Sequence, residues 1–262
     1  MTNETLTLTL DRVEFAAGNR TILKPLTVTL SGKGVTGLVG QNGSGKSTLL
    51  KLLARQQRPT GGRISFAGKP MEAWSDREFA RKLAYLPQQT PLATGLLVRE
   101  LVAMGRYPWH GALGRFAPAD QAAVDEALAL TGTDLLADRF VETLSGGERQ
   151  RAWFAMLVAQ QAALLLLDEP ISALDVAHQV SVLRLVRQLS EERGVGVLIV
   201  IHEINMAARF CDRMIALKNG DFIAHGSPAE IMTAEQLEAI YDVGMGTLPH
   251  PDSGSPIAYV RF

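Results

Sequence analysis

The feature that most constrains the chain is a glycine-rich segment, GQNGSGKST (40–48), between an apolar run and a helical pattern. The apolar run VTGLVG (35–40) predicts a short buried strand, and STLLKLLARQ (47–56) has the spacing of an amphipathic helix. The segment matches GxxxxGK[ST], in which consecutive backbone N–H groups point at phosphate oxygens at a helix N-terminus. Strand, loop and helix in this order predict a nucleotide-phosphate site.

Each residue type in this loop has a physical reason to be there. Gly43 and Gly45 let the backbone curl, Lys46 would place its charge on the β- and γ-phosphates, and the Ser47 hydroxyl suits Mg²⁺. A glycine-rich turn that only caps a helix is the alternative, and the strand before it and the helix after it argue against that. The predicted nucleotide contacts are Gly40, Gln41, Asn42, Gly43, Ser44, Gly45, Lys46, Ser47 and Thr48.

Composition limits the partner classes. The chain has 262 residues, of which 47% are hydrophobic and 20% charged, so it can bury a sizeable core. Its 26 Lys and Arg against 27 Asp and Glu argue against nucleic acid as the main partner, because phosphate contacts normally need a basic excess. A single cysteine, Cys211, excludes an intramolecular disulfide and a cysteine-based zinc site. No apolar run approaches the ~20 residues that span a bilayer, so we expect any membrane role to go through a partner.

The order of predicted elements indicates an α/β fold. Two apolar runs, LLLLDEP (164–170) and VGVLIVIH, predict buried strands of a parallel sheet covered by helices on both faces. Residues 6–15, 26–30 and 63–70 alternate apolar and polar side chains, which predicts half-buried antiparallel strands. A helical insertion is expected near 88–150.

Two further motifs carry candidate chemistry. In LLLLDEP, Asp168 ends a buried strand and would hold Mg²⁺, and Glu169 would act as general base towards the attacking water. In LSGGERQ (144–150), two glycines and a serine at a helix start form an anion site with no strand before it and no lysine after it. Ser145 as an ordinary helix N-cap is the alternative for this second motif.

Taken together, these motifs resemble the ATP-binding subunits of ABC transporters, and the resemblance covers nearly the whole chain. In that family the signature motif of one subunit closes over the ATP γ-phosphate held by the phosphate loop of the other. The resemblance therefore implies a homodimer in which the second copy's ATP is contacted by Ser145, Gly146, Gly147 and Glu148. Glu148 stands where glutamine is commonest.

The remaining family positions follow in order. Gln88 in YLPQQ would contact Mg²⁺ and water, and His202 in IVIHE would contact the γ-phosphate. Ser172 and Asp175 in SALD would belong to the loop that crosses the dimer. At the position of the usual adenine-stacking aromatic the chain has Ala17. The implied catalytic set is Lys46, Gln88, Glu169 and His202, with Mg²⁺ on Ser47, Gln88 and Asp168.

The resemblance also implies an organisation: one ABC ATPase domain over 1–262 with a P-loop NTPase core. We expect residues 1–87 and 151–226 to form a RecA-like core with an antiparallel β subdomain. Residues 88–150 would form the helical subdomain, and 227–262 a C-terminal appendage.

The implied activity is ATP hydrolysis that drives an importer. The chain most resembles the ATPases of iron–siderophore and vitamin B12 uptake, and within them the type that imports ferric hydroxamates. Other iron chelates, haem and cobalamin stay open as cargo, and a soluble ABC ATPase of DNA repair or translation is disfavoured. The implied partners are membrane permease subunits, a second copy and, indirectly, a periplasmic siderophore-binding protein, with the chain peripheral on the cytoplasmic face of the inner membrane.

The stretch MGRYPWHGALGRF (104–116) combines arginines, aromatic rings and glycines. Such a mixture is also typical of nucleic-acid loops. Its position between Gln88 and the signature instead implies contact with the permease, through Arg106, Tyr107 and Trp109. Packing of the rings inside the helical subdomain is the alternative.

Overall fold

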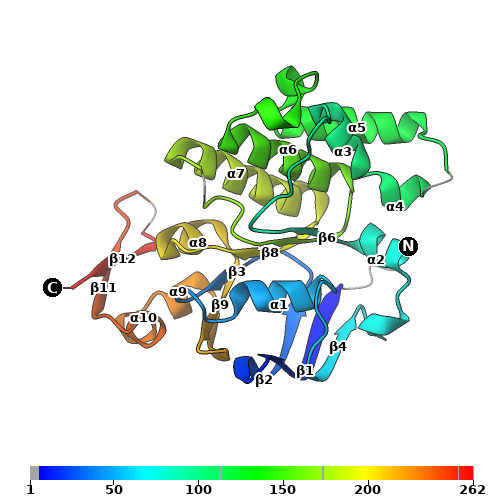
Figure 1. Ribbon diagram of the computed structural model, residues 1–262. Helices are drawn as coiled ribbons and strands as arrows, with labels where there is room; N and C mark the ends of the chain where they lie inside the picture. The colour runs from blue at the N-terminus through cyan, green and yellow to red at the C-terminus, as the bar shows by residue number, and fades with distance from the viewer. Residues whose placement is uncertain (1–5, 112–113, 173, 253, 262) are drawn as a thin grey trace. The chain divides into compact units, whose positions relative to one another are not determined.

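The computed structural model describes residues 6–111, 114–172, 174–252 and 254–261 (Figure 1). The chain divides into two compact units, one formed by Met1–Ala73 with Gly196–Phe262 and the other by Trp74–Val195. The second unit is larger than the helical subdomain expected over 88–150, because it also includes two strands and the helices that flank them.

The first unit contains an antiparallel sheet in the order β2-β1-β4-β5. Alternate residues of β1 such as Leu8 and Leu10 are buried, and their neighbours are more exposed, which is the pattern that the alternating sequence predicted. Residues of β1 pair with both β2 and β4, so this strand lies inside the sheet. The strands are β1 Thr7–Ala17, β2 Arg20–Ser31, β4 Gly61–Phe66 and β5 Lys69–Pro70.

The same unit contains four further strands in the order β10-β9-β3-β8. Strand β3 is fully buried and pairs in parallel with β8 on one side and β9 on the other. Asn219 and Gly220 have φ angles of 49° and 77° at the β9–β10 turn, the positive values expected for a hairpin there. The elements are β3 Val35–Val39, α1 Lys46–Leu53, η1 Met71–Ala73, β8 Gly196–Val200, α8 Ile204–Phe210, β9 Arg213–Lys218 and β10 Asp221–Gly226.

The C-terminal segment packs onto this unit as two helices and a hairpin. Its strands β11 and β12 pair in antiparallel register, and β12 contacts α8. The Ala258 N–H donates to Asn205 Oδ1 at 2.7 Å, and Asn205 Nδ2 donates back to the Ala258 carbonyl at 3.1 Å. The elements are α9 Pro228–Ile231, α10 Ala234–Tyr241, β11 Met245–Pro249 and β12 Pro256–Val260.

The second unit consists of two parallel strands and a group of helices. Strand β6 pairs with β7 in a register that places Leu86 beside Leu167. Helices α3, α5 and α6 pack against one another (Figure 1). The elements are α2 Asp76–Lys82, β6 Leu83–Leu86, α3 Val98–Met104, α4 Tyr107–His110, α5 Pro118–Leu130, η2 Asp134–Leu136, η3 Val141–Thr143, α6 Gly146–Ala159, β7 Leu164–Leu167 and α7 Val176–Arg193.

These elements confirm the α/β class, with parallel strands, an N-terminal antiparallel sheet and a helical part. Helix α7 ends where Gly194 takes a left-handed conformation, as the sequence pattern predicted. Among the described residues, no helix is both long enough and apolar enough to cross a membrane.

Candidate functional site

The phosphate loop joins β3 to α1 as expected. Gly40, Gly43 and Gly45 have φ angles of 135°, 77° and 105°, a region that side chains other than glycine rarely adopt. A Cβ on Gly40 would lie 2.0 Å from the Leu217 carbonyl oxygen, so the loop backbone passes too close to β9 for any side chain. The backbone is therefore free to turn its N–H groups towards an anion at the start of α1.

The polar groups of this loop suit a triphosphate. The Lys46 side chain is 5% exposed, and its Nζ donates to the carbonyls of Gly40 at 2.9 Å and Gln41 at 2.8 Å. The ammonium group is thus held over the loop rather than extended into solvent. Ser44 Oγ is buried without a hydrogen-bond partner, which is costly unless a ligand or water supplies one.

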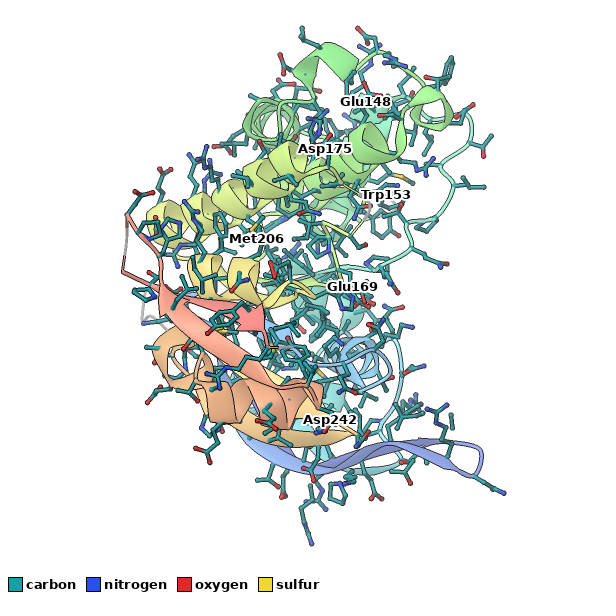
Figure 2. All side chains as sticks on the ribbon, turned by 90° about the vertical axis from the view of Figure 1, so that its left-hand side faces the viewer. Glu148, Trp153, Glu169, Asp175, Met206 and Asp242 are labelled. Atoms are coloured by element: carbon teal, nitrogen blue, oxygen red, sulfur yellow. The ribbon has the colours of Figure 1, made fainter. Side chains whose placement is uncertain are left out.

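The C-terminal segment contacts the phosphate loop through hydrogen bonds of Asp242. Gln41 Nε2 donates to Asp242 Oδ2 at 3.1 Å, and Lys218 Nζ donates to Asp242 Oδ1 at 2.5 Å. The Lys218 hydrogen bond is the main reason that the pKa of Asp242 lies below its usual range. Figure 2 labels Asp242 at the end of α10. Sequence reasoning did not connect the appendage with the phosphate loop, since the two segments are about two hundred residues apart.

In the second unit, Asp168 and Glu169 follow β7. Asp168 is 1% exposed, and its N–H donates to the Leu86 carbonyl at 2.9 Å, which extends the β6–β7 pairing by one residue. Glu169 has a φ of 51°, a strained backbone angle for a residue with a side chain. This turn separates the two carboxylates, so Asp168 stays buried while Glu169 is partly exposed.

Two side chains from the end of β6 bind these carboxylates. Gln88 Nε2 donates to Glu169 Oε2 at 2.7 Å. The Tyr85 hydroxyl donates to Asp168 Oδ2 at 3.5 Å, and burial together with the Asp168 charge raises the pKa of Tyr85. The structure therefore joins Gln88 to Glu169, both predicted site residues, and adds Tyr85. Tyr85 lies in YLPQQ, but a tyrosine in a strand gives no signal of contact with a carboxylate 83 residues away.

The signature motif forms the N-terminus of α6. Ser145 caps the helix, because its Oγ accepts from the Glu148 N–H at 3.3 Å while Glu148 Oε2 accepts from the Ser145 N–H at 2.9 Å. The hydrogen bond from the Ser145 N–H to the carboxylate is the largest cause that lowers the pKa of Glu148, and one from the Ser145 side chain adds to it. The N-cap alternative is thus realised, and it is compatible with anion binding because Gly146 is open: a Cβ there would meet no atom within 4 Å.

The SALD loop lies beside the signature in the same unit. A Cβ added to Gly147 would lie 3.2 Å from Leu174 Cδ2, so the two loops lie close to each other. Asp175 caps α7 by accepting from the His178 N–H at 2.9 Å, and Ser172 Oγ donates to the Glu169 carbonyl at 3.1 Å. Figure 2 labels Glu148, Glu169 and Asp175 in this unit. Ala173 lies outside the described residues.

The other predicted positions lie in the first unit. His202 is exposed two residues after β8 ends, directly before Glu203, which caps α8. Ala17 is exposed at the end of β1, and Phe15, two residues earlier, is half-buried.

The structure corrects the role expected for Arg106. Its side chain is only 6% exposed, and Nε donates to Asp120 Oδ1 at 2.9 Å. The same guanidinium donates to the Ala159 carbonyl at 2.8 Å and to Gln161 Oε1 at 2.9 Å. A side chain that is buried and bonded within its own unit does not present its charge to a partner, so Arg106 is a structural residue.

Tyr107 and Trp109 differ from each other in their surroundings. Tyr107 is 56% exposed, whereas Trp109 is 36% exposed and donates from Nε1 to the Gln160 carbonyl at 2.8 Å. The guanidinium groups of Arg81 and Arg106 lie 5.1 and 5.0 Å from the Trp109 ring. Trp109 therefore packs within its unit and stays partly exposed. Residues 112–113 of this stretch lie outside the described residues.

Comparison with known proteins agrees with these motifs. The family model described as ABC transporter matches residues 23–172. The chain is 39% identical over 257 residues to the ferric enterobactin transport ATP-binding protein FepC of Escherichia coli, covering 98% of this chain and 95% of FepC. It is 39% identical to the iron(3+)-hydroxamate import ATP-binding protein FhuC of Bacillus subtilis (95% and 93% covered) and 41% identical to the hemin import ATP-binding protein HmuV of Bordetella avium (100% of both).

Solved structures show the same relationship. A metal-chelate type ABC transporter in an inward-facing conformation superposes with a TM-score of 0.84 at 27% identity, covering 98% of both chains. A dimeric ATP-binding cassette in a post-hydrolysis state with ADP and phosphate gives 0.75 at 26% identity, covering 84% of this chain and 98% of the other. The chain therefore belongs to the ABC transporter family and is one of its ATP-hydrolysing subunits.

Proposed function

We propose that the chain is the ATPase subunit of an importer for iron chelates, with ferric hydroxamates as its cargo. The observation that carries the enzymatic part is the Gln88–Glu169 hydrogen bond of 2.7 Å beside a buried Asp168. A carboxylate fixed by an amide at the end of a strand is suited to hold and deprotonate a water molecule. The phosphate loop of the same chain would hold the ATP whose γ-phosphate the water attacks.

In this proposal water attacks the γ-phosphorus in line with the leaving ADP oxygen. Glu169 takes the proton of the water, Gln88 orients it, and His202 contacts the γ-phosphate. Lys46 neutralises the charge that develops on the phosphate oxygens. Ser47, Gln88 and Asp168 are the residues that would hold Mg²⁺, and the bound ion would neutralise phosphate charge; buried Asp168 has the hard oxygen ligands that Mg²⁺ prefers.

A second copy of the chain would complete each site. The proposed contacts in trans come from the signature, Ser145 to Glu148, with Ser172 and Asp175 in the loop beside it. The closeness of Gly147 to Leu174 supports this arrangement, because the two loops of one copy then lie side by side. An isolated monomer lacks half of each site, so we expect it to hydrolyse ATP slowly.

The membrane partner would be a permease of one or two subunits, fed by a periplasmic binding protein, with the chain peripheral on the cytoplasmic face of the inner membrane. The exposed Tyr107 and the partly exposed Trp109 are the proposed contacts with that permease. Aromatic side chains with an apolar face and a polar edge are frequent anchors of such interfaces.

The cargo proposal rests on resemblance to the hydroxamate type in four stretches: LAYLPQQ (83–89), VRELVAMGRYPWHGALGRF (98–116), LSGGERQRAWFAMLVAQ (144–160) and AHQV (177–180). Overall identity does not select the cargo, because relatives of similar identity carry different names. Those names refer to enterobactin, achromobactin, hydroxamate and hemin at 39–41% identity. The test is growth of an iron-starved strain that lacks its own chelate importers and carries this chain with its co-expressed permease. Growth on a ferric hydroxamate that depends on Lys46 is the expected result. Growth only with a catecholate, citrate, hemin or cobalamin source would contradict the hydroxamate assignment and identify that source as the cargo instead.

A further inference from the structure

The turn between α6 and β7 is hydrogen-bonded to α2 and to the start of β6. Gln160 Nε2 donates to the Ala80 carbonyl at 2.6 Å and to the Leu83 carbonyl at 3.3 Å. The Ala163 N–H donates to the Lys82 carbonyl at 3.1 Å. Because the last carbonyls of a helix have no partner within it, these donors cap the C-terminus of α2. They also fix the start of β6, which follows α2 without a break.

The same turn is hydrogen-bonded to α4. Trp109 Nε1 donates to the Gln160 carbonyl at 2.8 Å. At the C-terminus of α4, the carbonyls of Pro108 and Trp109 accept hydrogen bonds of 2.5–3.1 Å from the α2 side chains Arg77 and Arg81. Gln160 thus binds α4 through its main chain, and it binds α2 and the start of β6 through its side chain.

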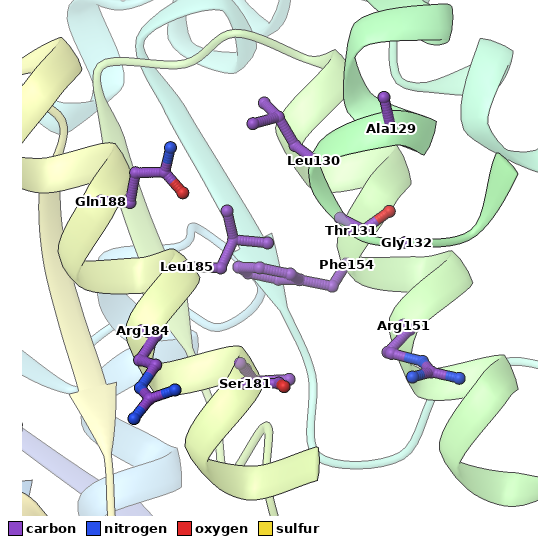
Figure 3. A pocket seen from close by; sticks show the side chains of 11 residues that line it. Ala129, Leu130, Thr131, Gly132, Arg151, Phe154, Ser181, Arg184, Leu185 and Gln188 are labelled. Atoms are coloured by element: carbon purple, nitrogen blue, oxygen red, sulfur yellow. The ribbon is translucent and has the colours of Figure 1, made fainter. Parts of the chain in front are cut away.

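Helix α6 holds Gln160 in place. Phe154 of α6 is 2% exposed and lines a cavity together with Leu185 of α7, and Figure 3 shows these two side chains next to each other. At the end of the helix, the Gln160 N–H donates to the Met156 carbonyl at 3.2 Å. Gln160 is therefore the fixed end of a packed helix, and its hydrogen bonds hold other elements against that helix.

The far end of β6 leads to a residue of the proposed reaction. Strand β6 is paired with β7 over its whole length, and Gln88 follows it, where Nε2 donates to Glu169 at 2.7 Å. Glu169 follows β7, which begins directly after the turn that contains Gln160. The turn therefore fixes the position of β6 relative to β7 at one end of the strands, and the Gln88–Glu169 hydrogen bond forms at the other end.

We propose that Gln160 is a positioning residue for ATP hydrolysis, which acts through Gln88 and transmits contact at α4. Its side chain holds the start of β6 against the turn that leads into β7, and so keeps Gln88 within hydrogen-bonding distance of Glu169. Its carbonyl binds Trp109, so a membrane partner that displaces α4 also displaces this turn. The inference rests on the proposed function, in which Gln88 orients the attacking water and α4 contacts the permease.

The first test removes the hydrogen bonds of the Gln160 side chain and keeps its shape. In the full chain, Gln160→Met should lower kcat about tenfold, within the roughly hundredfold that a misplaced reacting group can cost, with an unchanged KM for ATP. Gln160→Lys keeps a donor for the carbonyls at the end of α2 and should restore most of the rate. Gln188→Met is the matched control with a wild-type rate, because Gln188 is an exposed glutamine of the same unit that donates to Glu192.

A double-mutant cycle distinguishes positioning from a loss of folded protein. If Gln160 acts through Gln88, Gln160→Met should lower kcat less than about twofold in a Gln88→Ala background, because the effects of coupled residues are not additive. An equal loss in both backgrounds, or a wild-type rate in Gln160→Met, would overturn the assignment. A wild-type rate in Gln88→Ala alone would refute the proposed role of Gln88, and with it this inference.

The link to α4 is tested on the complex with the co-expressed permease. The readout is the ratio of the ATPase rate in the complex to the rate of the free chain, which we expect to exceed one in the wild type and to fall towards one in Gln160→Met. A merely structural loss lowers both rates equally, so an unchanged ratio would overturn the link. Gln160→Met should still co-purify with the permease. Failure to do so would place Gln160 in the docking surface and overturn its positioning role.

Discussion

Replacing Arg106 by leucine tests whether this arginine is a structural residue. The substitution removes the partner of Asp120, whose side chain is only 7% exposed, and also the hydrogen bonds to Ala159 and Gln161. Removing one partner of a buried ion pair typically lowers the free energy of unfolding by about 3–5 kcal/mol, because the remaining charge is left unpaired. We expect a loss of about 3 kcal/mol in the free energy of unfolding, since the Ala117 N–H still donates to Asp120 at 3.0 Å.

The pH dependence identifies the carboxylate that is responsible. The pKa of Asp120 lies below its usual value. The largest cause is the hydrogen bond from the Ala117 N–H, and the Arg106 guanidinium lowers the pKa further. A carboxylate whose folded pKa is depressed adds stability above its unfolded pKa, about 4, and loses it as the pH falls through the folded pKa. The stability gap between the wild type and Arg106→Leu should therefore be full at pH 7 and shrink below about pH 4.

The assay is urea unfolding followed by tryptophan fluorescence. All three tryptophans, at positions 74, 109 and 153, lie in the second unit, so the signal reports the unit that contains the ion pair. The control is Arg99→Leu, because Arg99 pairs with Asp138 at 2.5 Å with both side chains more than half exposed. Such surface pairs contribute about 0–1 kcal/mol. A loss as small as the control's, together with weaker permease binding, would refute the structural role and restore the interface role of Arg106.

Three further substitutions test other parts of the site. Tyr85→Phe removes the hydroxyl that donates to Asp168. The Mg²⁺ concentration needed for half-maximal ATPase activity should therefore rise severalfold, while the unfolding midpoint stays constant. An unchanged Mg²⁺ requirement would count against a role of Tyr85 in positioning Asp168. Gly45→Ala should lower ATP affinity at least tenfold by equilibrium binding, because its Cβ would lie 2.5 Å from Leu23 Cδ2, and wild-type affinity would contradict the loop geometry. Trp109→Ala should cost about 2 kcal/mol, below the 3–5 typical of fully buried tryptophans, with ATP affinity retained; unchanged stability with weaker permease binding would favour a pure interface role.

Local patterns in the sequence predicted most of the fold. The phosphate loop lies between β3 and α1 because its glycines, its lysine and the flanking apolar periodicity are all local signals. The same holds for the β9–β10 turn at Asn219 and Gly220. These features depend on neighbours a few residues away, and the chain's own spacing therefore specifies them.

Local sequence patterns could not predict contacts between segments that are far apart in the chain. Arg106 is buried because α5 and the end of α6 pack around it, which joins residues 14 and 53 positions apart. Nothing in the stretch GRYPW distinguishes a buried arginine from an exposed one. Likewise the hydrogen bond between Gln41 and Asp242 joins residues 201 positions apart. The LLLLDEP motif predicted Glu169 and family resemblance predicted Gln88, but the hydrogen bond between them came from the structure.

We propose that two copies of this chain enclose ATP and that Glu169 drives its hydrolysis. The most direct measurement is the mass of Glu169→Gln in solution with Mg²⁺ and ATP, by light scattering during gel filtration. We expect a stable particle of twice 28.4 kDa with ATP, a 28.4 kDa monomer without it, and no phosphate release. A variant that stays monomeric while binding ATP, or that hydrolyses ATP at the wild-type rate, would contradict the account.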